Sequence, residues 1–208
     1  MNLISLAVGI AIVLAVVAGV WWYYPFVRKP WGPSSDVNTR ANKICKDVGT
    51  EYPPGNPRIV ISKGKRELHL YDGDRLLKVY RIGLGTNPVD DKRREGDGCT
   101  PEGEFYICTK NDQSRYHLFL GLSYPNAEDA ERGRRTGLIS MVEYGQIIET
   151  IEQKRRPPWI TKLGGEIGIH GGGSNTDWTR GCIALSNSDI EELYMLIDFN
   201  TPVKITRE

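Results

Sequence analysis

The chain of 208 residues is poor in the residue types that most often hold metal ions or attract nucleic acids. It has only four cysteines and three histidines, and none of them falls into a Cys-x-x-Cys or His-x-x-x-His spacing. Its formal net charge is only +1, whereas nucleic-acid binding depends on a large excess of Lys and Arg. We therefore expect no zinc site and no nucleic-acid partner.

Charge is also absent from residues 3–27, LISLAVGIAIVLAVVAGVWWYYPFV. This run is long enough to cross a bilayer as a helix, and it ends in four aromatic residues of the kind found where hydrocarbon meets headgroups. We expect residues 1–27 to form a transmembrane anchor. A cleaved signal peptide is the alternative, because Val16 and Ala18 are small enough for a cleavage site, but no basic region precedes the run.

The segment that follows, residues 28–56, combines proline and glycine with mixed polar residues and shows no hydrophobic periodicity. Such a composition is typical of a linker. From residue 57 to residue 208 the pattern changes to that of one globular domain.

Most of this domain reads as β-structure. Short alternating or β-branched runs separated by turn residues predict strands; they cover residues 58–62, 67–71, 75–84, 103–109, 116–122 and 202–206. Two further short runs, 167–169 and 183–185, read as strands next to the glycine-rich segment. We expect a mainly β fold with accessory helices, either a sandwich or a curled mixed sheet.

Helical patterns are the minority. Ser188 and Glu191 have the spacing of a capping box, and apolar residues recur on one face after them, which predicts an amphipathic helix over 189–198. Residues 126–134 and 138–152 also read as helical, so residues 126–165 are expected to form a helical insertion in the domain. Trp159, in this insertion, is a candidate to cover part of a nearby site.

A histidine and a cysteine twelve residues apart, His170 and Cys182, are both embedded in glycine within IGIHGGGSNTDWTRGCIAL. A thiol needs a base to become a thiolate at neutral pH, and a histidine is the usual base. Gly171 and Gly181 permit tight turns, and backbone N–H groups around Gly181 and Arg180 would face a substrate carbonyl. These residues predict a catalytic dyad, although a structural loop with a buried thiol and a hydrogen-bonded histidine has the same composition.

The same segment resembles the signature of the L,D-transpeptidase family, the YkuD-type cysteine enzymes of bacterial cell-wall synthesis. The resemblance lies in IHG, the polar loop and TRGCIAL, and it extends upstream to GLGTNP and to GDGCTPEGEFYI. It covers roughly residues 58–205. It implies that Cys182 is the nucleophile, that His170 is its base, and that Thr179, which matches the family's Ser/Thr three residues before the cysteine, contacts the substrate.

Two positions depart from the family pattern. Many members have histidine just before the glycine and arginine two residues after the cysteine, where this chain has Arg180 and Ala184. The expected contact between an arginine and a substrate carboxylate is therefore missing at position 184. Arg180 is a candidate to supply a related charge.

The resemblance implies a peptidoglycan L,D-transpeptidase that needs no cofactor. Its partners would be peptidoglycan stem peptides, with an acyl group passing through a cysteine thioester to an amine. The alternatives are an L,D-carboxypeptidase or amidase that uses water at the same site, and a non-catalytic wall-binding module. Sequence does not separate these, because the acceptor is chosen by the shape of the site.

Peptidoglycan chemistry requires the domain to lie outside the cytoplasm, in the periplasm or on the cell-wall side. The positive charges, however, follow the apolar run at Arg28 and Lys29, and the positive-inside tendency would then leave the domain in the cytoplasm. Only a few residues contribute to this bias, so we give priority to the expected chemistry. An extracytoplasmic domain would also allow Cys99 and Cys108 to form a disulfide, which the sequence leaves open.

Overall fold

The computed structural model describes residues 31–208, which include the whole predicted globular domain. The predicted membrane segment, residues 3–27, lies outside the described residues. Within the part that is described, no helix is both long and apolar enough to cross a membrane.

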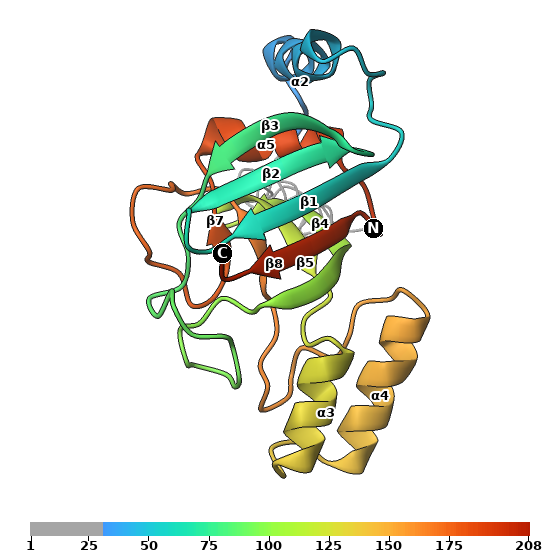
Figure 1. The fold of residues 1–208 in the computed structure, drawn as a ribbon, viewed down its shortest axis with the longest axis vertical. Coiled ribbons are helices and arrows are strands. Elements are labelled where there is room, and N and C mark those ends of the chain that lie inside the picture. The colour runs from blue at the N-terminus through green and yellow to red at the C-terminus, as the bar shows by residue number, and fades with distance from the viewer. Residues whose placement is uncertain (1–30) are drawn as a thin grey trace, which may run out of the picture. The chain divides into compact units, whose positions relative to one another are not determined.

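One sheet of eight strands organises residues 57–206 (Figure 1). Its order is β3-β2-β1-β8-β4-β5-β6-β7. The strands are β1 (Pro57–Ser62), β2 (Glu67–Asp72), β3 (Arg75–Arg81), β4 (Gly103–Ser114), β5 (His117–Leu122), β6 (Gly168–His170), β7 (Ile183–Ala184) and β8 (Pro202–Thr206). All strand runs expected from the sequence are present, and β1–β8 and β6–β7 are parallel while the other neighbours are antiparallel.

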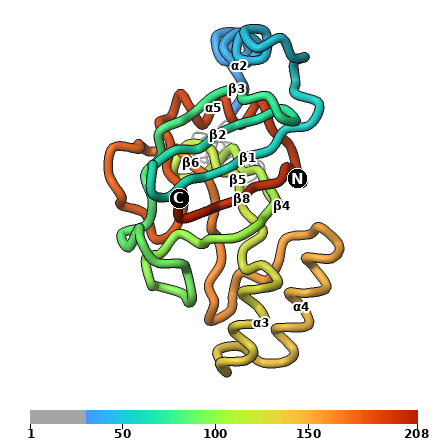
Figure 2. Tube along the Cα trace, in the orientation of Figure 1, coloured from blue at the N-terminus to red at the C-terminus, as the bar shows by residue number. Residues whose placement is uncertain are grey.

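Strand β4 is where the sheet curls. Residues 103–106 of β4 pair with β8, whereas residues 107–114 pair with β5. The register shifts between Ile107 and Thr109, which places a bulge at Cys108, and bulges bend and twist a strand. Figure 2 shows the chain turning here from one part of the sheet to the other. The expectation of a curled mixed sheet is therefore confirmed.

Alternating apolar side chains from the strands form the core. Buried leucine and isoleucine side chains come from β1, β2 and β5, and helix α5 (Asn187–Leu196) adds Ile190, Leu193 and Leu196 while packing on β5 and β6. Helix α5 begins two residues earlier than expected because Ser186, rather than Ser188, is the N-cap. Its hydroxyl accepts a hydrogen bond from the amide of Asp189 at 3.1 Å.

Residues 126–165, which the sequence predicts to be a helical insertion, contain two helices. Helices α3 (Ala127–Arg135) and α4 (Met141–Glu152) lie side by side as a hairpin (Figure 1) and both begin with a capping box. Ala130, Ile139, Ile147 and Leu163 form a small core of their own between the helices and the loop that follows. The hairpin thus carries its own packing.

The segment expected to be a linker contains a helix that the sequence analysis did not anticipate. Helix α2 (Ser35–Asp47) buries Val37, Ala41 and Cys45, which lie four residues apart along one face, and it packs against α5 and β3. Arg40 adds ion pairs to Glu191 at 3.1 Å and to Glu192 at 2.8 Å. The helix was missed because its buried face is made of small residues and gives little hydrophobic signal.

Docking of α2 predicts different outcomes for two neighbouring substitutions. Ala41→Glu would place a charge on the fully buried face, so we expect the free energy of unfolding to fall by about 2 kcal/mol or more and proteases to cut residues 48–56 faster. Asn42→Glu, on the exposed face of the same helix, is the control. Chemical denaturation and limited proteolysis measure both effects, and equal behaviour of the two variants would contradict the docking.

Candidate active site

Parallel pairing of β6 and β7 brings the two predicted catalytic residues together. Ile169 lies opposite Ile183 and His170 opposite Ala184, so Gly168 lies beside Cys182. Because side chains alternate between the faces of a sheet, His170 and Cys182 project from the same face of neighbouring strands. Gly168 is needed there, since a Cβ at this position would lie 2.5 Å from the ring of Phe119.

The Cys182 thiol is protonated at neutral pH. Its Sγ donates a hydrogen bond to the backbone carbonyl of Glu166 at 3.4 Å. Burial raises the pKa of the thiol to about 11, although the backbone amide of Gly168 and the charge of Lys92 act in the opposite direction. The sulfur therefore becomes a nucleophile only when a base removes its proton.

His170 has the geometry that such a base requires. Its Nδ1 lies 2.6 Å from the carbonyl oxygen of Gly171, an acceptor, so Nδ1 carries the hydrogen and Nε2 keeps its lone pair. Burial lowers the pKa of His170, which makes the ring neutral at pH 7. The pair at rest is a neutral thiol with a neutral imidazole, an arrangement for general-base catalysis.

Two aromatic rings hold the imidazole in place. Tyr116 stacks on His170 with a centroid distance of 4.6 Å and an interplanar angle of 22°. Trp178 meets the ring edge-on at 5.6 Å and is itself fixed by a hydrogen bond from its Nε1 to the carbonyl of Gly173 at 3.0 Å. Neither ring was identified from the sequence. Tyr116 lies more than fifty residues before the histidine, so no spacing rule relates the two.

The turn that carries Tyr116 is tied to helices α5 and α2. His117 follows with a left-handed φ of 75°, and its Nε2 lies 2.8 Å from a carboxylate oxygen of Glu191. The other oxygen of Glu191 pairs with Arg40. A chain of contacts therefore runs from α2 through Glu191 and His117 to the turn that carries the ring stacked on His170.

Thr179 has a structural role in the turn that ends at Cys182. Its buried hydroxyl donates to the carbonyl of Cys182 at 2.7 Å and accepts from the amide of Gly181 at 3.1 Å. Gly181 has a φ of 127°, and a Cβ there would lie 2.5 Å from the carbonyl oxygen of Cys99. The predicted substrate contact of Thr179 stays a prediction, since its hydroxyl is already used within the protein.

The remaining predicted site residues lie around the dyad in different ways. Arg180 is exposed next to Cys182. Gly171 supplies the carbonyl that orients His170, and a Cβ on it would lie 2.6 Å from the side-chain oxygen of Asn187. Ala184 is fully buried and exchanges backbone hydrogen bonds with Gly83.

Trp159 lies on the same face of the sheet as the dyad. A Cβ on Gly121, which pairs with Gly168, would lie 3.2 Å from its ring, and Phe119 meets the ring edge-on at 6.5 Å. The ring of Trp159 therefore lies against β5, two strands away from β7 in the sheet order. The guanidinium of Arg156 lies 4.8 Å from the centroid of this ring.

The loop of residues 92–100 packs against the turn that carries Cys182. Asp97 accepts hydrogen bonds from Lys92 and from the amides of Arg93, Arg94 and Cys99. Burial alone would raise the pKa of Asp97, but these hydrogen bonds outweigh it and lower the pKa. The Gly-Asp-x-x-Thr-Pro segment noted in the sequence therefore belongs to a hydrogen-bonded loop, residues 92–100, that packs against Gly181. This loop is called the bracket below.

Cys99 and Cys108 are both free thiols in the structure, as are Cys45 and Cys182. Cys99 is buried in the bracket and Cys108 lies at the bulge of β4. The structure thus contains no bridge that would withdraw Cys182 from the dyad.

A neutral resting pair predicts how alkylation of Cys182 depends on pH. Below a pKa of about 11 the thiolate fraction rises roughly tenfold per pH unit, so the rate of iodoacetamide labelling should keep rising from pH 6 to pH 9 without a plateau. Peptide mass spectrometry follows Cys182 and, as a buried reference, Cys99 in the same digest. A plateau for Cys182 near pH 7 would instead indicate a preformed thiolate–imidazolium pair.

Solved structures share this fold. The helical cell shape determining protein Pgp2 from Campylobacter jejuni, as a K307A mutant, is 23% identical with a TM-score of 0.53, and the match covers 85% of this chain and 57% of that one. A second Pgp2 structure is 21% identical with a TM-score of 0.51, covering 81% and 55%. An L,D-transpeptidase from Xylanimonas cellulosilytica is also similar, at 16% identity with a TM-score of 0.43, and the match covers 84% of this chain and 70% of that one.

This chain therefore spans a little over half the length of the Pgp2 chains that it matches. No curated protein matches the sequence. The model of the YkuD L,D-transpeptidase catalytic domain matches residues 56–205, which include the whole sheet and both members of the dyad. Most of the chain is thus accounted for by a single family model, and the protein belongs to the YkuD L,D-transpeptidase family.

Proposed function

We propose that this protein is a cysteine-dependent peptidoglycan L,D-transpeptidase. The observation that carries the proposal is the register of β6 and β7, which sets a half-buried thiol beside a histidine whose Nδ1 is tied to the carbonyl of Gly171. Membership of the family supplies the substrate class, the peptide stems of the bacterial cell wall.

In the first half of the reaction, Nε2 of His170 takes the proton of Cys182 as the sulfur attacks the carbonyl carbon of the third residue of a tetrapeptide stem. The C–N bond to the terminal D-alanine then breaks, and the departing nitrogen takes the proton from His170. The stem remains attached to Cys182 as a thioester.

In the second half, the side-chain amine of another stem attacks the thioester and gives its proton to His170. The C–S bond breaks, the sulfur recovers the proton, and a 3-3 cross-link or an attached wall protein results. No step requires a cofactor. Because the amide of Gly181 already donates to Thr179, we assign oxyanion binding to the backbone amides next to it, at Arg180 and Cys182.

A second candidate is hydrolysis at the same site, as an L,D-carboxypeptidase or amidase. It is favoured by position 184, where a buried alanine replaces the arginine of many family members and offers no charge to an acceptor stem. Water would then attack the thioester and release a shortened stem.

The proposed substrate requires the domain to face the periplasm or cell wall. We further propose that residues 3–27 anchor the chain in the membrane, because this run has no charge and ends in aromatic residues. The basic residues after the run favour the opposite orientation, so the side on which the domain lies needs a direct test.

Turnover of a defined substrate tests the chemistry. The full chain in detergent is incubated with disaccharide tetrapeptides, and products are identified by mass spectrometry. We expect a dimer that lacks one D-alanine, no product with Cys182→Ala, and a rate at least about 100-fold lower with His170→Ala because the base is lost.

Cys108→Ala is the matched control, since it removes a thiol away from the dyad. Tripeptide without dimer would instead establish the carboxypeptidase. If the chain forms no product and its Cys182 does not react with thiol probes, the non-catalytic wall-binding module is correct.

A reporter at the C-terminus tests the location of the domain. We expect alkaline phosphatase, which is active only outside the cytoplasm, to be active when fused after Glu208, and a green fluorescent protein that folds only in the cytoplasm to be dark. The reverse pattern would contradict the peptidoglycan substrate, because that polymer lies outside the membrane.

A further inference from the structure

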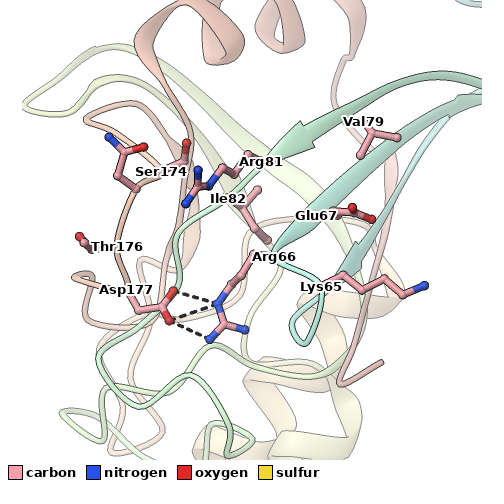
Figure 3. Close-up of a pocket in the computed structure, with 10 residues that line it drawn as sticks. Lys65, Arg66, Glu67, Val79, Arg81, Ile82, Ser174, Thr176 and Asp177 are labelled. Atoms are coloured by element: carbon pink, nitrogen blue, oxygen red, sulfur yellow. Dashed lines mark hydrogen bonds and ion pairs between the residues drawn. The ribbon is translucent and has the colours of Figure 1, made fainter.

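A cavity of about 630 Å³ lies beside the loop that links His170 to Cys182. One wall comes from residues 65–67 and from the end of β3, and the other from residues 174–177 of the loop (Figure 3). Hydroxyl and amide side chains cover the loop side, and cations predominate on the strand side. The cavity is separate from the dyad, and the mechanism above does not use it.

Three of the charged groups that line the cavity already have partners. Arg66 binds Asp177 through two nitrogens at 2.8 to 3.1 Å, as Figure 3 shows, and Glu67 pairs with His69 at 2.8 Å. The Arg66–Asp177 pair joins the two walls, whereas Glu67 and His69 both belong to β2, where Glu67 lies opposite Arg81 in the β2–β3 register.

Arg81 differs from these groups because, among residues 31–208, no ion pair or hydrogen bond engages its guanidinium. Its exposed side chain lines the cavity together with Ser174 and lies near it in the view of Figure 3. A free guanidinium with a nearby hydroxyl donor is suited to a carboxylate, which it can bind through two hydrogen bonds.

The cavity and the dyad share a structural element. Gly83 and Ala184 exchange backbone hydrogen bonds at 2.9 and 2.8 Å as an antiparallel pair. Arg81 lies two residues before Gly83, and Cys182 lies two residues before Ala184. Because the two chains run in opposite directions, Arg81 and Cys182 lie on opposite sides of the Gly83–Ala184 pair. Four residue steps of extended chain separate them by about 13 Å, roughly the length of an extended tetrapeptide.

The loop wall also connects with the histidine. Asp177 accepts a hydrogen bond from the amide of Leu84 at 2.8 Å, and the next residue, Trp178, contacts His170. Substitutions at Arg66 or Asp177 would therefore disturb the dyad directly. Arg81 is the residue through which the cavity can be tested without moving this loop.

We propose that this cavity is a subsite in which Arg81 and Ser174 bind a carboxylate of a peptidoglycan stem while the stem is held at Cys182. The proposal rests on the peptide substrate proposed above. It offers this chain a cation for substrate recognition at a place different from position 184, where alanine supplies none.

Binding to the full chain carrying Cys182→Ala, in which no turnover occurs, tests the subsite. Isothermal titration compares a disaccharide tetrapeptide with the same compound whose glutamate and diaminopimelate carboxylates are amides. We expect the carboxylate form to bind about tenfold more tightly, and Arg81→Gln to remove this preference, because a charge-assisted hydrogen bond is lost.

Arg135→Gln is the matched control, since it removes an exposed arginine from α3, outside the cavity. Equal affinity for the two peptides in the Cys182→Ala chain, or a preference that survives Arg81→Gln, would overturn the subsite, as would the absence of any binding. Equal affinity for the two peptides overturns the subsite even if Arg81→Gln does not fold. Because turnover by the unmodified chain is scored separately, failure of the subsite is distinguishable from failure of the proposed activity.

Discussion

The close approach of three backbone segments at glycine positions is the constraint on which the catalytic region depends. A Cβ on Gly85 would lie 2.0 Å from the carbonyl oxygen of Gly98 and 3.2 Å from the Cα of Gly181. A Cβ on Gly181 would in turn meet the carbonyl of Cys99. Residues 83–85 after β3, the 92–100 loop and the turn that carries Cys182 therefore touch without side chains between them, and this contact fixes the position of that turn.

Buried lysines secure one of these segments. Lys63 is 1% exposed and donates to the carbonyls of Asp90 and Thr100 and to the carboxylate of Glu102, at 2.7 to 3.0 Å. A buried ammonium is tolerated only when its hydrogen bonds are satisfied, so Lys63 holds both ends of the loop in one arrangement. Lys92 does the same through Asp97, and its charge also favours the thiolate of Cys182. The bracket thus supplies both geometry and electrostatics.

The sequence predicted the strands, the insertion and the two members of the dyad because each has a local pattern: alternation, capping residues, or glycine around a reactive side chain. It did not predict α2, whose buried face of valine, alanine and cysteine is weakly hydrophobic. Nor could it predict that Tyr116, Glu191 and Arg40 act around His170, since these contacts join residues far apart in the chain and no spacing rule relates them. Trp159 illustrates an intermediate case, because its place near the site was anticipated but its distance from the dyad depends on the strand order.

The burial that leaves Cys182 dependent on its base has a consequence for the chemical durability of the protein. Oxidation by peroxide and thiol–disulfide exchange both proceed through the thiolate. Burial raises the pKa of all four thiols, to about 12 for Cys108 and about 11 for Cys182, and Cys45 and Cys99 are almost inaccessible to solvent. Burial therefore slows the oxidation of these sulfur atoms, and in the proposed mechanism the sulfur of Cys182 becomes reactive only while a substrate is being attacked.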